Sequence, residues 1–144
     1  MFGSPCPILP LGVKSAKGWT KIDAYVDSGA SYSIFAATEA DRLGVRIRDG
    51  QQAAAKVGDG VKIPVFLHKF PVQVGPHRFN AQIGFSEQLA VGFNLLGRLD
   101  FFSYFDFLFS DSDGELTLRK NDRREKRGII HVIAIARARK ARRT

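Results

Sequence analysis

Closely spaced turn signals divide most of this 144-residue sequence into short segments with the composition of strands. The turn GDG at residues 58–60 separates QAAAKV from VKIPVFL, and GPH at residues 75–77 separates HKFPVQV from RFNAQIGF. Glycine and aspartate favour hairpin turns, whereas β-branched and aromatic residues favour strands. Many short strands at this spacing are typical of a small β-barrel or sandwich. The sequence therefore predicts an all-β domain.

Two further segments predict strands from their residue pattern. WTKIDAYV, residues 19–26, places Ile22, Ala24 and Val26 on one face of an extended chain. FDFLF and ELTLRK, within residues 105–120, predict a last hairpin around the turn SDSDG.

One or two short helices are expected beside the strands. ATEADRLGV, residues 37–45, predicts a helix with Thr38 as its N-cap and Gly44 as its C-terminal stop. NLLGRLDFFSYF predicts a second short helix after Gly97.

Composition limits the chain to a single globular domain. A mass of 15.9 kDa with 44% hydrophobic residues provides one core. Cys6 is the only cysteine, so an intramolecular disulfide is excluded and a reducing compartment is favoured. The first 18 residues are rich in proline and glycine and are a poor signal peptide, and we expect them to form an N-terminal extension. No apolar run reaches the roughly 20 residues of a membrane helix, so the expected location is cytoplasmic.

The positive charge is concentrated at the C-terminal end. Residues 119–144 hold 11 Lys and Arg residues against Asp122 and Glu125, a net charge of +9, so the remaining residues carry −1 of the total +8. We expect a solvated basic tail that binds polyanions weakly and without sequence specificity, because it has no aromatic residues to stack on bases. The alternative is that residues 129–135 form an extra strand, within the chain or between two chains.

Two motifs stand out within residues 19–118. AYVDSGASYSIF places a carboxylate, Asp27, at the end of an apolar run and directly before Ser-Gly-Ala. These residues also suit an ordinary turn, so the motif alone is not decisive. FNLLGR, residues 93–98, is a second apolar run that ends in Gly-Arg, and a glycine-tipped hairpin lies between the two motifs.

This order of strand, Asp-Ser-Gly-Ala, hairpin and Leu-Leu-Gly-Arg resembles the retropepsin-like aspartic proteases. The elements RLGV, LLGRLDFF and FDFLFSDSDGELTL are similar to the bacterial single-domain members related to the retroviral enzymes. The resemblance covers about residues 19–118 and implies a small closed β-barrel of the acid-protease type. It also implies an aspartic endopeptidase that acts on polypeptides without a cofactor or metal.

Peptide hydrolysis by such an enzyme needs two carboxylates that share one proton. One activates a water molecule and the other delivers a proton to the amide. Because Asp-Ser-Gly occurs once, the second carboxylate must come from a second copy, which predicts a homodimer with both Asp27 side chains beside the symmetry axis.

The resemblance also assigns supporting roles in the active-site loop. The Ser28 hydroxyl is expected to bond to the opposite loop across the axis. Gly29 permits close approach of the two loops, and Ala30 leaves room for the substrate backbone. Leu95, Leu96, Gly97 and Arg98 are expected to lie beneath this loop and support it.

The hairpin tip is the candidate flap, formed by Val57, Gly58, Asp59 and Gly60. A flap opens to admit an extended chain and closes to exclude water, which favours glycine at its tip. An ordinary glycine turn is the alternative. The substrate is expected to bind as an added strand.

One position departs from the family pattern. In the retroviral enzymes the residue after this alanine is typically an aspartate paired with the arginine of Gly-Arg, but here it is Ser31. Arg98 is therefore expected to find Asp100 or a backbone carbonyl as its partner. The departure keeps a second hypothesis open, namely a catalytically weak module that binds peptides or dimerises. The three histidines are not spaced as metal ligands.

Overall fold

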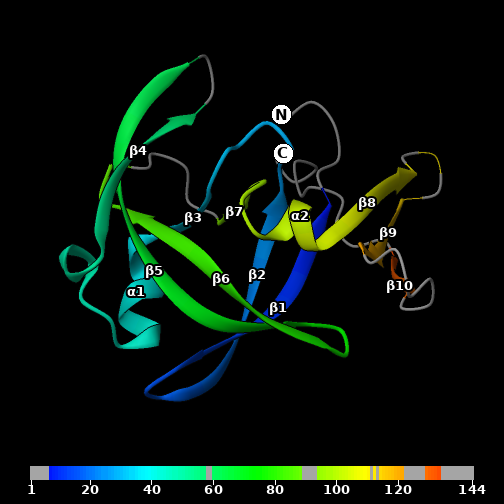
Figure 1. Ribbon diagram of the computed structural model, residues 1–144, viewed down its shortest axis with the longest axis horizontal. Helices are drawn as coiled ribbons and strands as arrows, with labels where there is room; N and C mark the ends of the chain where they lie inside the picture. The colour runs from blue at the N-terminus through cyan, green and yellow to red at the C-terminus, as the bar shows by residue number, and fades with distance from the viewer. Residues whose placement is uncertain are drawn as a thin grey trace, which may run out of the picture.

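The computed structural model describes residues 7–57, 60–88, 94–110, 112, 114–121 and 129–133 (Figure 1). The strands are β1 (Ile8–Ser15), β2 (Gly18–Val26), β3 (Ser33–Ala36), β4 (Gln51–Val57), β5 (Val61–Val74), β6 (His77–Ser86), β7 (Leu95–Leu96), β8 (Phe105–Ser110), β9 (Glu115–Lys120) and β10 (Ile129–Ile133). The helices are α1 (Ala37–Leu43), α2 (Phe101–Tyr104) and a 3-10 turn, η1 (Ile47–Asp49). The predicted all-β fold with short helices is confirmed.

The main sheet closes on itself. Its strands follow the order β1-β2-β7-β3-β6-β5-β4, and β1 also pairs with β5 through Gly12 opposite Gln73 and Val13 opposite Val72. These pairings make a ring of β1, β2, β7, β3, β6 and β5, with β4 attached to the first half of β5. The sequence predicts two strands over residues 61–74, but β5 is continuous and serves both β4 and β1.

The main core lies inside this ring and extends to buried residues of β8 and β9. Alternate residues of the strands point inward, as Ile22, Ala24 and Val26 do on β2, and are buried. The largest fully buried side chains are Phe35, Phe85, Phe101, Phe105, Leu9, Ile22, Ile34, Leu43, Ile83, Leu96, Leu116 and Leu118. Helices α1 and α2 contribute Leu43 and Phe101 to this core.

The segment that the sequence predicts to be an N-terminal extension contributes strand β1. Residues 8–15 pair along their whole length with β2, from Ile8 opposite Tyr25 to Ser15 opposite Gly18. Leu9, Leu11 and Val13 alternate along β1 and are buried in the core.

Helix α1 ends as predicted but begins differently. Gly44 has the left-handed conformation, with φ 72°, and its N–H donates to the Asp41 carbonyl, so it stops the helix as expected. The prediction that Thr38 is the N-cap is wrong, because the extended residue before the helix is Ala36, the last residue of β3. The helix starts directly from a strand, which places Thr38 inside its first turn.

A second sheet consists of β10, β9 and β8 in that order. It contains the predicted last hairpin, and it lies on the side of the molecule away from α1 (Figure 1). Strand β10 pairs with β9 of the same chain. Residues 129–133 therefore form the extra strand that was the alternative to a solvated tail, and this strand lies within the chain. The other tail residues, 122–128 and 134–144, lie outside the described residues. Within the described part of the chain, no helix is long and apolar enough to cross a membrane.

Candidate active site

Asp27 is the first residue after β2 and begins a tight loop. Its own N–H donates to the Leu96 carbonyl oxygen at 3.0 Å, and its carbonyl oxygen accepts from the Ala30 N–H at 3.1 Å. The carboxylate oxygen Oδ1 accepts from the Gly29 N–H at 2.9 Å. The side chain is half-buried. Asp27 therefore sits at the rim of the barrel, where a backbone amide orients its carboxylate.

Strand β7 brings the two sequence motifs together. Its two residues pair in parallel with β2, Leu95 opposite Tyr25 and Leu96 opposite Val26. Leu95 also pairs in antiparallel fashion with Ile34 of β3. Both leucines are buried. The Leu-Leu segment thus lies between the strand that leads into the Asp27 loop and the strand that leaves it.

Gly97 locks the base of this loop. Its N–H donates to the buried Ser33 Oγ at 2.9 Å. A Cβ at this position would lie 2.8 Å from the Ala30 carbonyl oxygen and still closer to the Tyr32 carbonyl group. The loop backbone packs against the Gly97 Cα, so only glycine fits there without displacing it.

The next two residues hold the loop from the same side. The N–H of Arg98 donates to the Ala30 carbonyl at 2.9 Å, and that of Leu99 donates to the Ser31 carbonyl at 3.0 Å. Ala30 is buried beneath the loop, whereas Ser28 and Gly29 are exposed at its tip. The Ser28 hydroxyl has no hydrogen-bond partner among the described residues.

The Arg98 side chain does not have the partners that the sequence predicts. Among the described residues it makes no ion pair or hydrogen bond, and its guanidinium lies 6.0 Å from the centre of the Phe102 ring. The Asp100 carboxylate instead accepts from the Gln82 N–H, with 2.7 Å between Oδ2 and N.

The candidate flap is carried by the β4–β5 hairpin. The register from Gln51 opposite Leu67 to Val57 opposite Val61 places residues 58–60 at the tip. Gly58 and Asp59 lie outside the described residues. Gly60 has φ 95°, and a Cβ there would meet no atom within 4 Å. In Figure 1 this end of the hairpin rises above the rest of the molecule.

A small separate core lies under the middle of this hairpin and extends toward its tip as far as the Ala55–Ile63 pair. Ala55, Ile63 and Val65 of the hairpin pack with Ile34 of β3, and the partly buried residues Tyr32, Ala53 and Leu67 surround them. Because β3 directly follows the Asp27 loop, the hairpin is anchored next to that loop.

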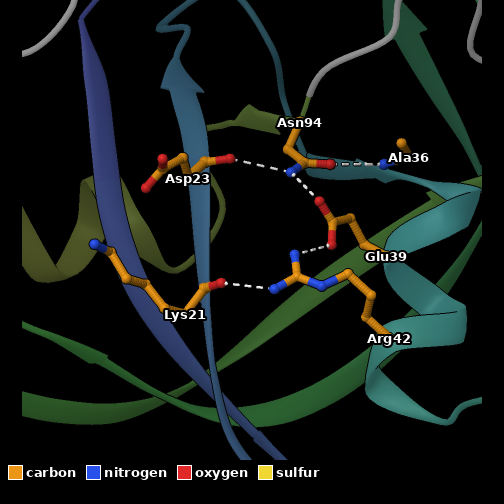
Figure 2. Close-up of polar contacts among 6 residues, drawn as sticks. All are labelled: Lys21, Asp23, Ala36, Glu39, Arg42 and Asn94. Atoms are coloured by element: carbon orange, nitrogen blue, oxygen red, sulfur yellow. Dashed lines mark hydrogen bonds and ion pairs between the residues drawn. The ribbon is translucent and has the colours of Figure 1, made fainter.

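A polar network around Asn94, which the sequence analysis does not predict, braces the same region (Figure 2). The Asn94 Nδ2 donates to the Asp23 carbonyl and to Glu39 Oε2, both at 3.0 Å, and its Oδ1 accepts from the Ala36 N–H at 2.8 Å. Only 5% of Asn94 is exposed. The side chain therefore ties β2, the β3–α1 junction and the start of β7 together.

Arg42 of α1 extends this network to the barrel wall. It donates to Glu39 Oε1 at 2.7 Å and to the Lys21 carbonyl on β2 at 3.1 Å (Figure 2). An asparagine inside the apolar run FNLLGR is the sequence signal for this network, because a buried amide needs hydrogen-bond partners.

Histidine and carboxylate side chains form no other site in the described part of the chain. No group of three or more His, Cys, Asp or Glu residues is placed there to hold a metal ion. The His68 Nε2 lies 2.9 Å from the Ile47 carbonyl oxygen, and the His77 ring packs edge-on against Tyr104 and Phe105.

Comparisons with known proteins agree with this architecture. No protein-family model matches the sequence, and no curated protein matches it. The retroviral protease-like domain of Ddi1 from Leishmania major has a similar structure, with a TM-score of 0.56 and 16% identity over 90% of this chain and 96% of that one. A retropepsin-like aspartic protease from Rickettsia conorii matches with a TM-score of 0.53 and 18% identity over 72% of this chain and 91% of that one.

The chain therefore has the retropepsin fold. The resemblance inferred from the sequence is confirmed at the level of the fold, since both neighbours carry that description and each aligns over most of its own length. At 16% and 18% sequence identity, the structural similarity establishes the fold alone.

Proposed function

We propose that this protein is an aspartic endopeptidase that hydrolyses peptide bonds as a homodimer. The observation that carries the proposal is the position of Asp27 on a retropepsin fold, at the end of β2 and against the Leu96–Gly97 segment. A carboxylate that is half-buried at the rim, and oriented by the Gly29 amide, is available to a reacting water molecule. The Rickettsia conorii neighbour is described as an aspartic protease, which supports the same activity here.

The chemistry requires two such carboxylates, one ionised and one protonated. The ionised Asp27 removes a proton from water as the water oxygen attacks the carbonyl carbon. The protonated Asp27 of the other copy stabilises the developing oxyanion by donating its proton. Collapse of the tetrahedral intermediate breaks the C–N bond: the leaving nitrogen takes the proton that the first Asp27 removed from water, and one hydroxyl of the intermediate returns its proton to the second Asp27. The pair then returns to its starting protonation state.

Features of the loop support a symmetric pair. Ser28 and Gly29 are exposed at the loop tip, and the Ser28 hydroxyl is available to a backbone group of a second copy. An exposed glycine allows two loops to approach closely. The dimer places the two Asp27 side chains beside a twofold axis, with Leu95, Leu96 and Gly97 supporting each loop from below.

The β4–β5 hairpin is the proposed flap. The small core around Ile34 holds it as far as the Ala55–Ile63 pair, whereas its tip carries Gly60 in a conformation that L side chains rarely adopt. A glycine tip beyond an anchored stem suits a segment that closes over an extended peptide. Val57, Gly58 and Asp59 complete this tip, and the substrate would lie between it and the Asp27 loop as an added strand.

The test is cleavage of a mixed peptide library by the wild type and by Asp27→Asn, from about pH 3 to about pH 7. Asp41→Asn is the matched control, because Asp41 is exposed on α1 and belongs to no part of the proposed site. Cleavage by the wild type and the control but not by Asp27→Asn, with equal circular dichroism for all three, is the expected result. Cleavage that survives Asp27→Asn would refute the proposal.

A second candidate is a peptide-binding or dimerisation module with little turnover. Ser31 favours it, as does Arg98, which has no ion pair among the described residues, because the ion pair expected beside the loop from the family resemblance is missing there. Tight peptide binding by a folded dimer without cleavage across the same pH range would select this candidate. For either function a cytoplasmic location is proposed, since a single cysteine suits a reducing compartment.

A further inference from the structure

The Arg98 side chain is a cation with no acidic partner among the described residues. It is exposed, and within the described residues its only close contact of note is the ring of Phe102, 6.0 Å from the guanidinium carbon. The retroviral pattern supplies an aspartate at the position of Ser31, but a serine hydroxyl cannot neutralise the charge. Within the described part of the chain Arg98 has no acidic partner, so an acid from outside the subunit can pair with it.

Asp100 is the nearest acid in sequence, and it is already engaged. Its Oδ2 accepts from the Gln82 N–H at 2.7 Å, which ties α2 to β6. The residue also has φ 70°, the only positive φ at a non-glycine residue in the described part of the chain. A conformation of this kind is costly for aspartate and persists only where surrounding contacts hold it. One oxygen of its carboxylate is therefore already engaged, and among the described residues Asp100 forms no ion pair with Arg98.

A pocket of about 390 Å³ lies beside Arg98, lined by Ser31, Arg98, Leu99, Asp100, Phe102 and Ser103. Its walls combine apolar surface from Leu99 and Phe102 with two hydroxyls, the Arg98 guanidinium and the Asp100 carboxylate. Because the Asp100 carboxylate accepts from the Gln82 N–H, Arg98 is the charged group in the wall that has no acidic partner among the described residues. This combination suits a short aliphatic stem that ends in a carboxylate, because the stem packs on the apolar wall and the carboxylate meets two kinds of donor.

The pocket is connected to the active-site loop by backbone hydrogen bonds. The backbone N–H groups of Arg98 and Leu99 bond to the carbonyls of Ala30 and Ser31, three and four residues after Asp27. The pocket therefore adjoins the exposed edge of this loop at Ser31, four residues after Asp27.

We propose that the Arg98 pocket selects substrates with an acidic side chain, glutamate above all, near the scissile bond. This inference rests on the proposed endopeptidase activity. In a C2 dimer the pocket occurs twice, once on each side of the two Asp27 carboxylates. Glutamate is therefore preferred at one position before the scissile bond and at a corresponding position after it.

The solvent exposure of Arg98 limits the strength of the glutamate preference. An ion pair at the surface contributes up to about 1 kcal/mol, which corresponds to about a fivefold change in kcat/KM. Salt screens such a pair, so the preference decreases as ionic strength rises. The change appears mainly in KM, because the carboxylate is held equally in the bound ground state and in the transition state.

The experiment uses one peptide that the full-length wild type cleaves, with Glu or Gln at each position around its scissile bond. We expect a Glu-to-Gln ratio of kcat/KM of about 5 at two positions on opposite sides of the bond, falling toward 1 at about 1 M salt. Arg98→Gln brings the ratio to about 1 at low salt, and Arg98→Lys keeps part of it because the charge remains. Arg78→Gln is the matched control, since Arg78 is an exposed arginine that lies over the Trp19 ring on another strand, and it keeps the wild-type ratio.

The outcomes separate this inference from the proposed activity. Asp27-dependent cleavage with no Glu preference, or a preference that persists in Arg98→Gln, overturns the inference and leaves the protease proposal intact. A different result would assign the pocket to a carboxylate of the partner subunit: the wild type shows no Glu preference, and Arg98→Gln fails to dimerise. That result also overturns the inference. If Arg98→Gln is inactive for every peptide, two other measurements test the inference: the fall of the wild-type Glu-to-Gln ratio with salt, and the Glu-to-Gln ratio of Arg98→Lys. A wild-type ratio that does not fall with salt, or an Arg98→Lys ratio of about 1, overturns the inference. Absence of any cleavage refutes the proposed function itself.

Discussion

Replacing Asn94 should loosen the whole candidate site without touching a reacting group. The Asn94 side chain makes three hydrogen bonds, to the Asp23 carbonyl, the Glu39 carboxylate and the Ala36 N–H. Each joins segments that are far apart in the sequence. Asn94→Ala removes all three and leaves the Ala36 N–H without its acceptor.

The expected cost can be worked from these contacts. A hydrogen bond contributes about 1 kcal/mol on average, and one to a charged group contributes more, so the three together give about 3 kcal/mol. For a domain of this size about 3 kcal/mol lowers Tm by roughly 10 °C. Asn94→Asp should cost at least as much near neutral pH, because it keeps the shape but places a carboxylate within hydrogen-bonding distance of Glu39.

Urea unfolding followed by circular dichroism measures this cost. Asn80→Ala is the matched control, because Asn80 is exposed on β6 opposite Pro71 and its loss should change stability by less than about 0.5 kcal/mol. An Asn94→Ala variant within about 0.5 kcal/mol of the wild type would refute the bracing role. An Asn94→Asp variant as stable as the wild type would show that the Glu39 contact is unimportant.

Three further predictions follow from the same geometry. Gly97→Ala should destabilise the protein by about 3 kcal/mol or more in urea unfolding, because its Cβ meets the backbone of Ala30 and Tyr32, and wild-type stability would contradict the close packing. Peptide cleavage should pass through a maximum with pH and be lost on both sides, since the dyad needs one ionised and one protonated carboxylate, so a profile that rises or falls in one direction only would count against it. Truncation after Asn121 should abolish retention on a heparin column, and wild-type retention should fall steeply with salt, whereas equal retention of both forms would remove the tail from consideration.

Most of the fold follows from local patterns in the sequence. The alternation in WTKIDAYV and the turn signals around residues 60 and 75 place the strands and hairpins correctly, because side-chain period and turn chemistry are local properties. The same alternation is present in ILPLGVKS, residues 8–15, but Pro10 and Gly12 obscure it. Tertiary pairing with β2 and β5 overrides their low strand propensity.

The contacts of the candidate site are harder to foresee. The sequence predicts that Asp27 and the Leu-Leu-Gly segment lie together, and β7 pairs with β2 beside Asp27. The partners of polar side chains depend on which distant backbone groups remain unpaired, which no local pattern reveals. Asn94 is the clearest case. Asp100 is another, since the residue expected to pair with Arg98 is committed to Gln82 by the packing of α2 on β6.

The central claim is that each active site needs Asp27 from two copies of the chain. Mixing wild type with Asp27→Asn under unfolding conditions and refolding them together, so that subunits combine at random, at a fixed total concentration well above the dimer dissociation constant, tests it directly. If both carboxylates are required, activity falls with the square of the wild-type fraction, to about one quarter of the pure wild-type rate in an equal mixture, because heterodimers are inactive. Activity of about one half in that mixture, in direct proportion to the wild-type fraction, would contradict the account, since it would mean that a single Asp27 suffices.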